Sequence, residues 1–244
     1  MILDVNTLDL RKALQSVLPH AADDVPAIAG VSITATVDNL YLTATNRYTI
    51  GHAIASVWDA RRLTGNPADD TFFISIETAK EILALFKSSG KKSDDEVGVG
   101  EAMRITVDDE NLRFLDVAGL FPGKLLQIPR EESEPFPVKW ASVFLNSLRA
   151  NKVLPERLAT SGKYLRLFSS AAAAYGEPLV IEPTEGSSIL ISCGESFLGL
   201  LMPVRASDET EVYRQIEAWR MGWAHRLPEL AAAMPPMMRE DVKA

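Results

Sequence analysis

The sequence predicts an α+β protein built from repeated units of antiparallel sheet, each with one amphipathic helix on its inner face. Two observations carry this prediction. A helix followed by a group of strands occurs three times, beginning near residues 7, 77 and 138, so the period is roughly 65 residues. Between the helices, apolar and polar residues alternate as in half-buried strands. Each helix can then cover one sheet.

The first unit opens with a helix that Asn6 or Thr7 can cap and that Pro19 ends. Residues 31–58 follow as three strands, because β-branched and aromatic residues alternate along them. Polar pairs at 38–39 and 46–47 mark the two turns between these strands.

The second unit is a short strand, a helix from about Glu77 to Lys87 and further strands with a hairpin turn at 108–111. Residues 120–137 are rich in proline and acidic residues, and we interpret them as the link between two structural units.

The third helix begins near Val138. Four strands are predicted after it, at 163–170, 177–183, 187–194 and 196–204. An amphipathic helix over 209–227 then places Val212, Ile216, Trp219 and Trp223 on one side. The predicted domains are 1–128, a shorter 129–206 and a helical extension at 207–244.

Composition limits the class of protein. The chain has 244 residues, 47% of them apolar and 24% charged, which suits one large domain or two ordinary ones. Its single cysteine, Cys193, excludes an intramolecular disulfide and favours a cytoplasmic location. We expect no signal peptide and no membrane span. The formal net charge of −8 argues against a surface that binds nucleic acid everywhere, but permits a local basic face.

The sequence gives little support for a catalytic site or a metal-binding site. His20, His52 and His225 have no second histidine or cysteine at ligand spacing. The acidic triplets at 94–96 and 108–110 can hold a hard cation, yet acidic residues are routine in turns. Cys193 has no neighbouring base. We therefore expect no enzyme, no catalytic residue, no metal and no cofactor.

Basic residues lie on or beside each of the three helices. One interpretation is that cations near helix C-termini simply suit the helix dipole. The other is that the helices line one surface that contacts the phosphates of a polyanion. The candidates are Arg11, Lys12, Lys80, Lys87, Arg149 and Lys152.

Four segments, in this order, resemble the bacterial DNA polymerase III beta subunit, the sliding clamp family. They are LYLTATNRYTIGHAI at 40–54, FLDVAGLFPGKLLQIP at 114–129, FPVKWASVFLNSLRAN at 136–151 and FLGLLMPVR at 197–205. The resemblance implies a DNA-clamp-like fold and a homo-oligomeric ring around duplex DNA that tethers a polymerase and other client peptides. A clamp loader is a further implied partner. The chain is shorter than three-domain members, which suggests a shortened, divergent and possibly phage-encoded relative.

The resemblance also implies a hydrophobic groove for a client peptide, walled by the turn after the Ala-Thr strand and by the Met-Pro strand. Its residues would be Thr45, Arg47, Tyr48, Thr49, Leu201, Met202, Pro203 and Arg205. The plainer alternative is that Leu201 and Met202 are core and Tyr48 is an edge residue. Two other functions remain open: a clamp-like peptide-binding module that does not encircle DNA, and an unrelated enzyme that uses the acidic triplets with a metal.

Overall fold

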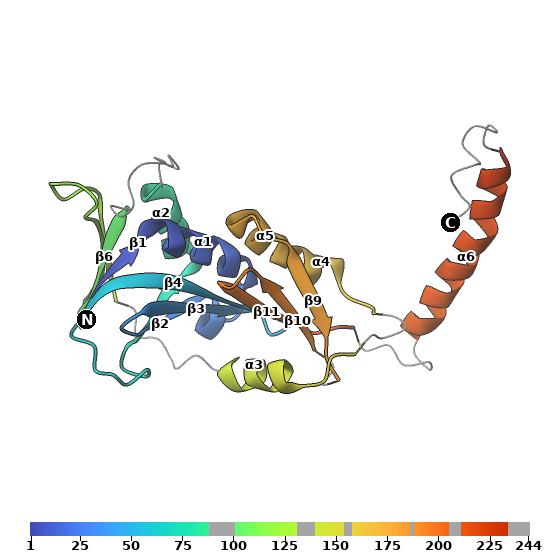
Figure 1. Cartoon of the computed structure of the whole chain (residues 1–244), viewed down its shortest axis with the longest axis horizontal. Helices are drawn as coiled ribbons and strands as arrows, with labels where there is room; N and C mark the ends of the chain where they lie inside the picture. The colour runs from blue at the N-terminus through green and yellow to red at the C-terminus, as the bar shows by residue number, and fades with distance from the viewer. Residues whose placement is uncertain (88–100, 131–139, 154–157, 186–187, 205–210, 234–244) are drawn as a thin grey trace. The chain divides into compact units, whose positions relative to one another are not determined.

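The computed structural model describes residues 1–87, 101–130, 140–153, 158–185, 188–204 and 211–233 (Figure 1). Met1–Pro203 forms one compact unit, and a second unit begins at Val204. The first unit is a curled antiparallel sheet with helices packed against it, which confirms the predicted α+β class. The proposed boundary at residue 128 stays a prediction.

The sheet follows the order β5-β2-β3-β4-β1-β6-β7-β8, with all neighbours antiparallel. These strands are β1 (Ile2–Asn6), β2 (Gly30–Ala35), β3 (Asn39–Thr45), β4 (Thr49–Arg61), β5 (Thr71–Ser75), β6 (Ala102–Val107), β7 (Asn111–Asp116) and β8 (Leu125–Pro129). A second path leaves from β4, whose first half also pairs with β11 (Phe197–Leu201). Strand β11 pairs with β10 (Ile189–Cys193), and β10 pairs with β9 (Leu179–Pro183).

Three helices cover one face of this sheet: α1 (Thr7–Val17), α2 (Ile76–Leu85) and α5 (Ser169–Tyr175). Helix α3 (Trp140–Arg149) packs on the opposite face. Strand β10 shows the division, because Ile189 and Ile191 join the main core with α1 while Leu190 packs with Phe144 of α3. Short helical turns complete the unit: η1 (Leu18–His20), η2 (Pro26–Ile28), α4 (Gly162–Leu165) and η3 (Arg166–Phe168).

Local signals explain the first elements. The Asn6 side chain accepts hydrogen bonds from the backbone N–H groups of Leu8 and Asp9, so the predicted cap of the first helix is confirmed. The helix ends at Val17, two residues before Pro19. The three strands predicted for 31–58 are β2, β3 and β4, with turns where the polar pairs lie.

Three segments differ from the prediction. Residues 163–170 are helical, not a strand, because Phe168 and Ala171, three residues apart, turn into the core together. The predicted link at 120–137 contains β8, whose Leu126 and Ile128 face the core while the alternating Leu125, Gln127 and Pro129 are exposed. Strand β1, before the first helix, was not predicted.

Two histidines are buried on opposite faces of the sheet. His20 lies against the rings of Phe168 and Phe197, and burial lowers its pKa to about 3. His52 lies 4.4 Å from the ring of Trp140, centroid to centroid, and burial lowers its pKa to about 4. Both imidazoles are therefore neutral at pH 7.

The second unit contains α6 (Glu211–Ala233). Its Trp219, Trp223 and Leu227 are more than half exposed, and the Arg226 guanidinium lies 5.7 Å from the ring centre of Trp223. A helix is confirmed over most of the predicted 209–227; residues 209–210 lie outside the described residues. No helix in the described ranges is long and apolar enough to cross a membrane.

Candidate partner-binding site

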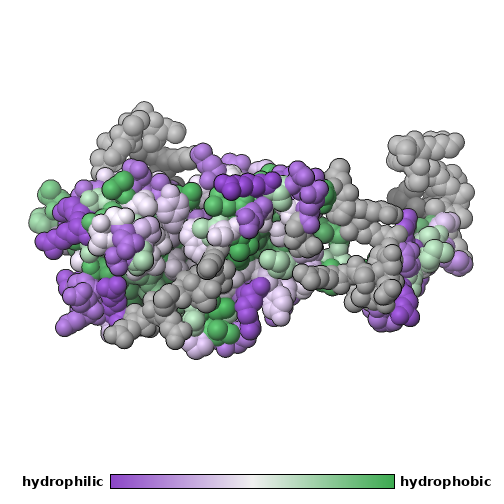
Figure 2. All heavy atoms as spheres, turned by 90° about the horizontal axis from the view of Figure 1, so that it is seen from below, coloured by the Kyte–Doolittle hydropathy of each residue, from purple (hydrophilic) through white to green (hydrophobic). Residues whose placement is uncertain are grey.

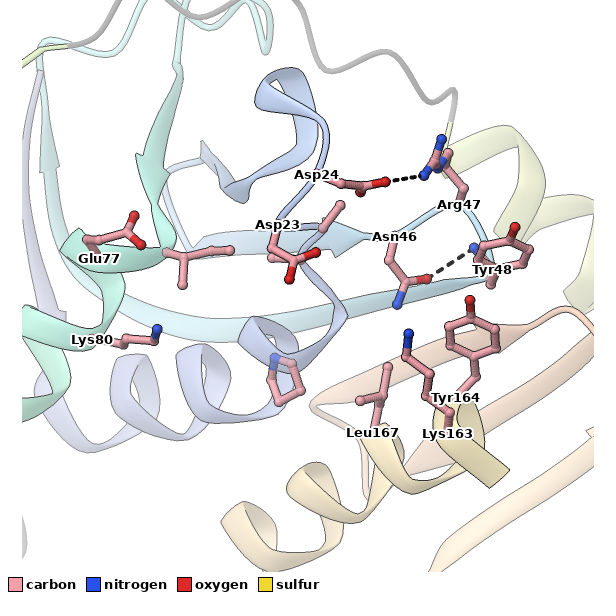
Figure 3. A pocket seen from close by; sticks show the side chains of 14 residues that line it. Asp23, Asp24, Asn46, Arg47, Tyr48, Glu77, Lys80, Lys163, Tyr164 and Leu167 are labelled. Atoms are coloured by element: carbon pink, nitrogen blue, oxygen red, sulfur yellow. Dashed lines mark hydrogen bonds and ion pairs between the residues drawn. The ribbon is translucent and has the colours of Figure 1, made fainter. Parts of the chain in front are cut away.

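The turn at Asn46–Tyr48 borders a cavity of about 510 Å³ (Figure 3). Three other segments contribute to its walls: the loop after η1, the first turn of α2 and the α4–η3 segment. Its lining residues include Asp23, Asp24, Asn46, Arg47, Tyr48, Glu77, Lys80, Lys163, Tyr164 and Leu167. The cavity thus joins residues far apart in the sequence around the predicted turn.

Hydrogen bonds fix the turn. The Asn46 side-chain carbonyl accepts from the backbone N–H groups of Tyr48 at 3.1 Å and Thr49 at 2.8 Å. The Thr45 hydroxyl donates to the Thr49 carbonyl at 2.7 Å. Arg47 has a φ of 76°, a left-handed conformation that these bonds hold in a non-glycine residue. Tyr48 is therefore presented in one defined position.

The buried side chain of His20 contacts the end of this turn. Its Nδ1 lies 2.9 Å from the Thr49 hydroxyl, and that hydroxyl donates to Asn46 at 3.1 Å. Since the hydroxyl proton is used, Nδ1 of His20 carries the proton of the neutral ring and donates to Thr49. A protonated His20 would have to place a second N–H in an apolar wall, which agrees with its depressed pKa.

Aromatic and charged side chains form the rim. The rings of Tyr48 and Tyr164 stack with centroids 4.7 Å apart, and Lys163 Nζ lies 5.5 Å from the Tyr164 centroid. Arg47 forms an ion pair with Asp24 at 2.7 Å, but both side chains are more than half exposed, so the pair adds little stability. This rim offers stacking surface and both signs of charge to a partner.

The structure brings the two predicted groove segments together. The backbone N–H of Met202 donates to the Tyr48 carbonyl at 2.9 Å, and Leu201 pairs with Thr49. Tyr48 is 49% exposed and Met202 is 40% exposed, so both can touch a partner. Arg47 is also exposed and Pro203 is half-buried.

Three other predicted groove residues have structural roles instead. Thr45, Thr49 and Leu201 are at most 1% exposed, so they support the turn and the core and do not wall an open groove. Arg205 lies outside the described residues.

The predicted DNA-facing residues fall into two groups. Lys12 of α1, Lys80 of α2 and Lys87 just after α2 belong to the face covered by α1, α2 and α5. Arg11 is on this face too, but its guanidinium donates to the carbonyls of Leu83 at 2.6 Å and Phe86 at 2.5 Å. It therefore binds α1 to the end of α2.

Arg149 and Lys152 are on or beside α3, against the opposite face of the sheet. They do not share the expected common surface, because the apolar side of α3 packs on Leu190 and Leu200 instead of on the main core. Exposed Lys163 and Arg166 lie on the face that α1 covers, and sequence reasoning missed them because their segment was predicted as a strand. The helical spacing of Phe168 and Ala171 is the signal that identifies it.

The acidic triplet at 108–110 belongs to the β6–β7 turn. The Asp108 carboxylate accepts from the N–H groups of Asn111 and Glu110, and these bonds, with nearby Arg113, lower its pKa. Among the described residues, no group of three or more histidine, cysteine or acidic side chains is placed to hold a metal. The triplet at 94–96 lies outside them.

The sequence matches no known family model, and no curated protein is detectably similar to it. Solved structures of bacterial clamps are similar in fold. The DNA polymerase III beta subunit of Thermotoga maritima has 13% identity and a TM-score of 0.56, covering 87% of this chain and 66% of that one. The Streptococcus pyogenes beta subunit has 14% identity and a TM-score of 0.58, covering 84% and 66%. The Bacillus subtilis DNA polymerase sliding clamp has 14% identity and a TM-score of 0.56, covering 85% and 65%. The chain thus has the clamp fold and spans about two thirds of the length of these proteins.

Proposed function

We propose that this chain, which has the fold of the sliding clamps, is a processivity factor of DNA replication. It assembles with copies of itself into a ring around duplex DNA and tethers replication proteins through the surface beside Tyr48 and Met202. The likeness of fold over most of the chain is the observation that carries the proposal. Tethering raises the effective concentration of a polymerase at the template without any chemistry.

The helix-covered face is the proposed DNA side. Exposed Lys80, Lys163 and Arg166 on this face come from two different segments of the chain. Lys80 and Lys163 also line the cavity beside Tyr48, so the proposed DNA side borders the partner-binding surface. Contacts of such side chains with phosphates carry no base recognition, which suits a protein that moves along DNA. The overall charge of −8 keeps the remaining surface from binding DNA.

Free strand edges support self-assembly. No described strand pairs with the outer edge of β8 or with that of β9, which other described residues bond only at its end, where the N–H of Val153 donates to the Pro183 carbonyl. These edges expose Leu125, Val180 and Ile181. Two different edges that pair between copies make a head-to-tail interface, which closes into a ring when the rotation allows. The mass of the native assembly, measured by mass spectrometry, would give the number of chains in the ring. A monomer at high concentration that does not load onto circular DNA would contradict the ring.

The charge reversal Lys80→Glu is expected to weaken duplex binding without unfolding the protein, because it removes an exposed cation from the proposed DNA side. The slope of log K against log salt should fall by about 1. Fluorescence anisotropy of a labelled duplex at several salt concentrations measures both quantities. Arg149→Glu is the matched control, since Arg149 is also an exposed cation but lies on α3, and the variant should bind as wild type does. Equal effects of the two variants would refute this choice of DNA side.

The truncation Met202→Ala is expected to weaken the binding of client peptides by about tenfold, as a half-exposed methionine contributes roughly 1.4 kcal/mol when a partner covers it. Isothermal titration with peptides from replicative polymerase subunits measures the loss. Val37→Ala is the control, because it truncates a 67%-exposed apolar side chain in the turn between β2 and β3 instead. Peptides that bind both variants with wild-type affinity would show that Met202 is not part of the groove.

The alternative function is a clamp-like peptide-binding module that does not encircle DNA. Arg11 favours this alternative. Its guanidinium, which was predicted to contact DNA, instead donates to the carbonyls of Leu83 and Phe86. Loss of peptide binding in Met202→Ala, together with no effect of Lys80→Glu on DNA, would support this alternative.

A further inference from the structure

Helix α3 covers an apolar patch on the sheet face opposite α1, α2 and α5. We call this patch the α3 seat: Ile50, His52, Leu190, Leu198 and Leu200. Three of its four aliphatic members, Ile50, Leu190 and Leu200, are at most 6% exposed and form a hydrophobic cluster with Phe144 that is separate from the main core. Without α3, these residues would form an exposed apolar surface on three adjacent strands.

Helix α3 is held by a small apolar contact and by the backbone that follows it, where the N–H of Val153 donates to the carbonyl of Pro183 at 3.0 Å. Phe144 is its one large buried anchor, at 4% exposure, and the half-buried ring of Trp140 lies against His52. The Ser147 hydroxyl lies 3.0 Å from that of Ser188. A helix of 10 residues is too short to be stable by itself in water, so α3 is helical only while it is docked. The contacts of the docked helix are therefore opposed by the conformational entropy that the whole segment gains when it is released.

The outer side of α3 remains apolar. Leu145 and Leu148 are 48% and 49% exposed, three residues apart on the helix. Figure 2, which views the molecule from the α3 side, shows hydrophobic side chains exposed among polar ones on this face. A surface helix that stays docked usually has a polar outer side, so the exposed leucines of α3 are unusual for such a helix.

The α3 seat continues into the candidate groove. Ile50 directly follows Thr49 at the end of the Asn46–Tyr48 turn, and Met202 follows Leu198 and Leu200 in the alternation of β11. Met202 is exposed, while Leu200 lies beneath α3. The apolar surface is thus open at the Met202 end and covered at the other end by a segment of the same chain.

We propose that the α3 seat is a binding site for an amphipathic segment of a partner protein, and that α3 occupies it until such a partner displaces it. Helix α3 defines the chemistry of the ligand: two aromatic side chains four residues apart, as in Trp140 and Phe144, followed by a small residue where Ser147 lies. The covalent connection keeps α3 at a high local concentration, so only a tighter ligand replaces it. This inference deepens the peptide-binding part of the proposed function and does not involve DNA.

The test uses a fluorescein-labelled peptide of residues 136–152 and the full-length chain. We expect Phe144→Ala to bind the peptide at least about tenfold more tightly than wild type, because its own α3 no longer competes for the seat. Leu145→Ala is the matched control: it truncates an exposed residue of the same helix and should bind as wild type does. A peptide with alanine in place of Trp140 and Phe144 should not bind. Equal binding by Phe144→Ala and wild type, or equal binding of the two peptides, would overturn the proposal.

Hydrogen exchange of the unmodified chain tests the same inference without a variant. The amides of α3 should exchange by local opening, faster than those of β4 and β11, and unlabelled peptide should increase the difference. Protection of α3 as strong as that of β4 would overturn the proposal. Duplex binding of the same variants is measured separately, so a failure of the α3 seat is distinguishable from a failure of the clamp function.

Discussion

Lowering the pH from 7 to 5 is expected to reduce the free energy of unfolding by about 4 kcal/mol. His20 and His52 are buried and neutral, with pKa values lowered from 6.5 to about 3 and about 4. Below pH 6.5 the unfolded chain binds a proton at each histidine and the folded chain does not. Stability is therefore fully present above pH 6.5 and falls with pH, by about 1.4 kcal/mol per pH unit for each histidine.

Urea unfolding curves at pH 7, 6 and 5 measure this dependence. Replacing either buried histidine, as in His20→Phe or His52→Phe, should remove about half of the loss. Asp4→Asn is the control. The pKa of Asp4 is lowered from 3.8, chiefly by its hydrogen bond with Arg104, so its contribution disappears only at more acidic pH. The variant should be less stable than wild type by the same amount at all three pH values. A flat profile for wild type would show that the two histidines take up protons in the folded protein as they do in the unfolded chain.

The truncation Phe168→Ala is expected to cost about 3–5 kcal/mol of stability. The Phe168 ring is fully buried, with its centroid 4.7 Å from His20 and 6.3 Å from Phe197. It connects the α4–α5 segment with η1 and β11, so its loss leaves a cavity between three elements. Leu165→Ala, in the same segment but 37% exposed, is the control and should cost less than about 1 kcal/mol. Thermal and urea unfolding measure both.

A double-mutant cycle sharpens this test. A Cβ atom added to Gly199 would lie 2.4 Å from Cε1 of Phe168, closer than real contacts allow. Gly199→Ala should therefore destabilise the wild type by about 1–3 kcal/mol and should be much better tolerated beside Phe168→Ala. Additive costs for the two substitutions would mean that the ring does not pack against β11.

The candidate site was partly predictable because its two strands carry local motifs. The turn after Ala44 and the Met-Pro strand were recognisable, and the pairing of Leu201 with Thr49 brings them together. The stack of Tyr48 on Tyr164 was not predictable. This stack requires residues 163–168, KYLRLF, to be helical. Apolar and polar residues also alternate along this run as in a strand, and a run this short fits both the helical and the strand period.

The sequence by itself determined the class of fold, the capped first helix, the β2–β4 meander and the strands β9–β11, because each depends on periodicity and turn residues within a short span. Only the tertiary structure decided on which face of the sheet each helix lies. The amphipathic pattern of α3 indicates that one side of this helix is buried. It does not indicate which face of the sheet covers that side. Strand β10 accepts a helix on either face, since Ile189, Leu190 and Ile191 are all buried. The choice therefore depends on α1 and α5, which already occupy the other face.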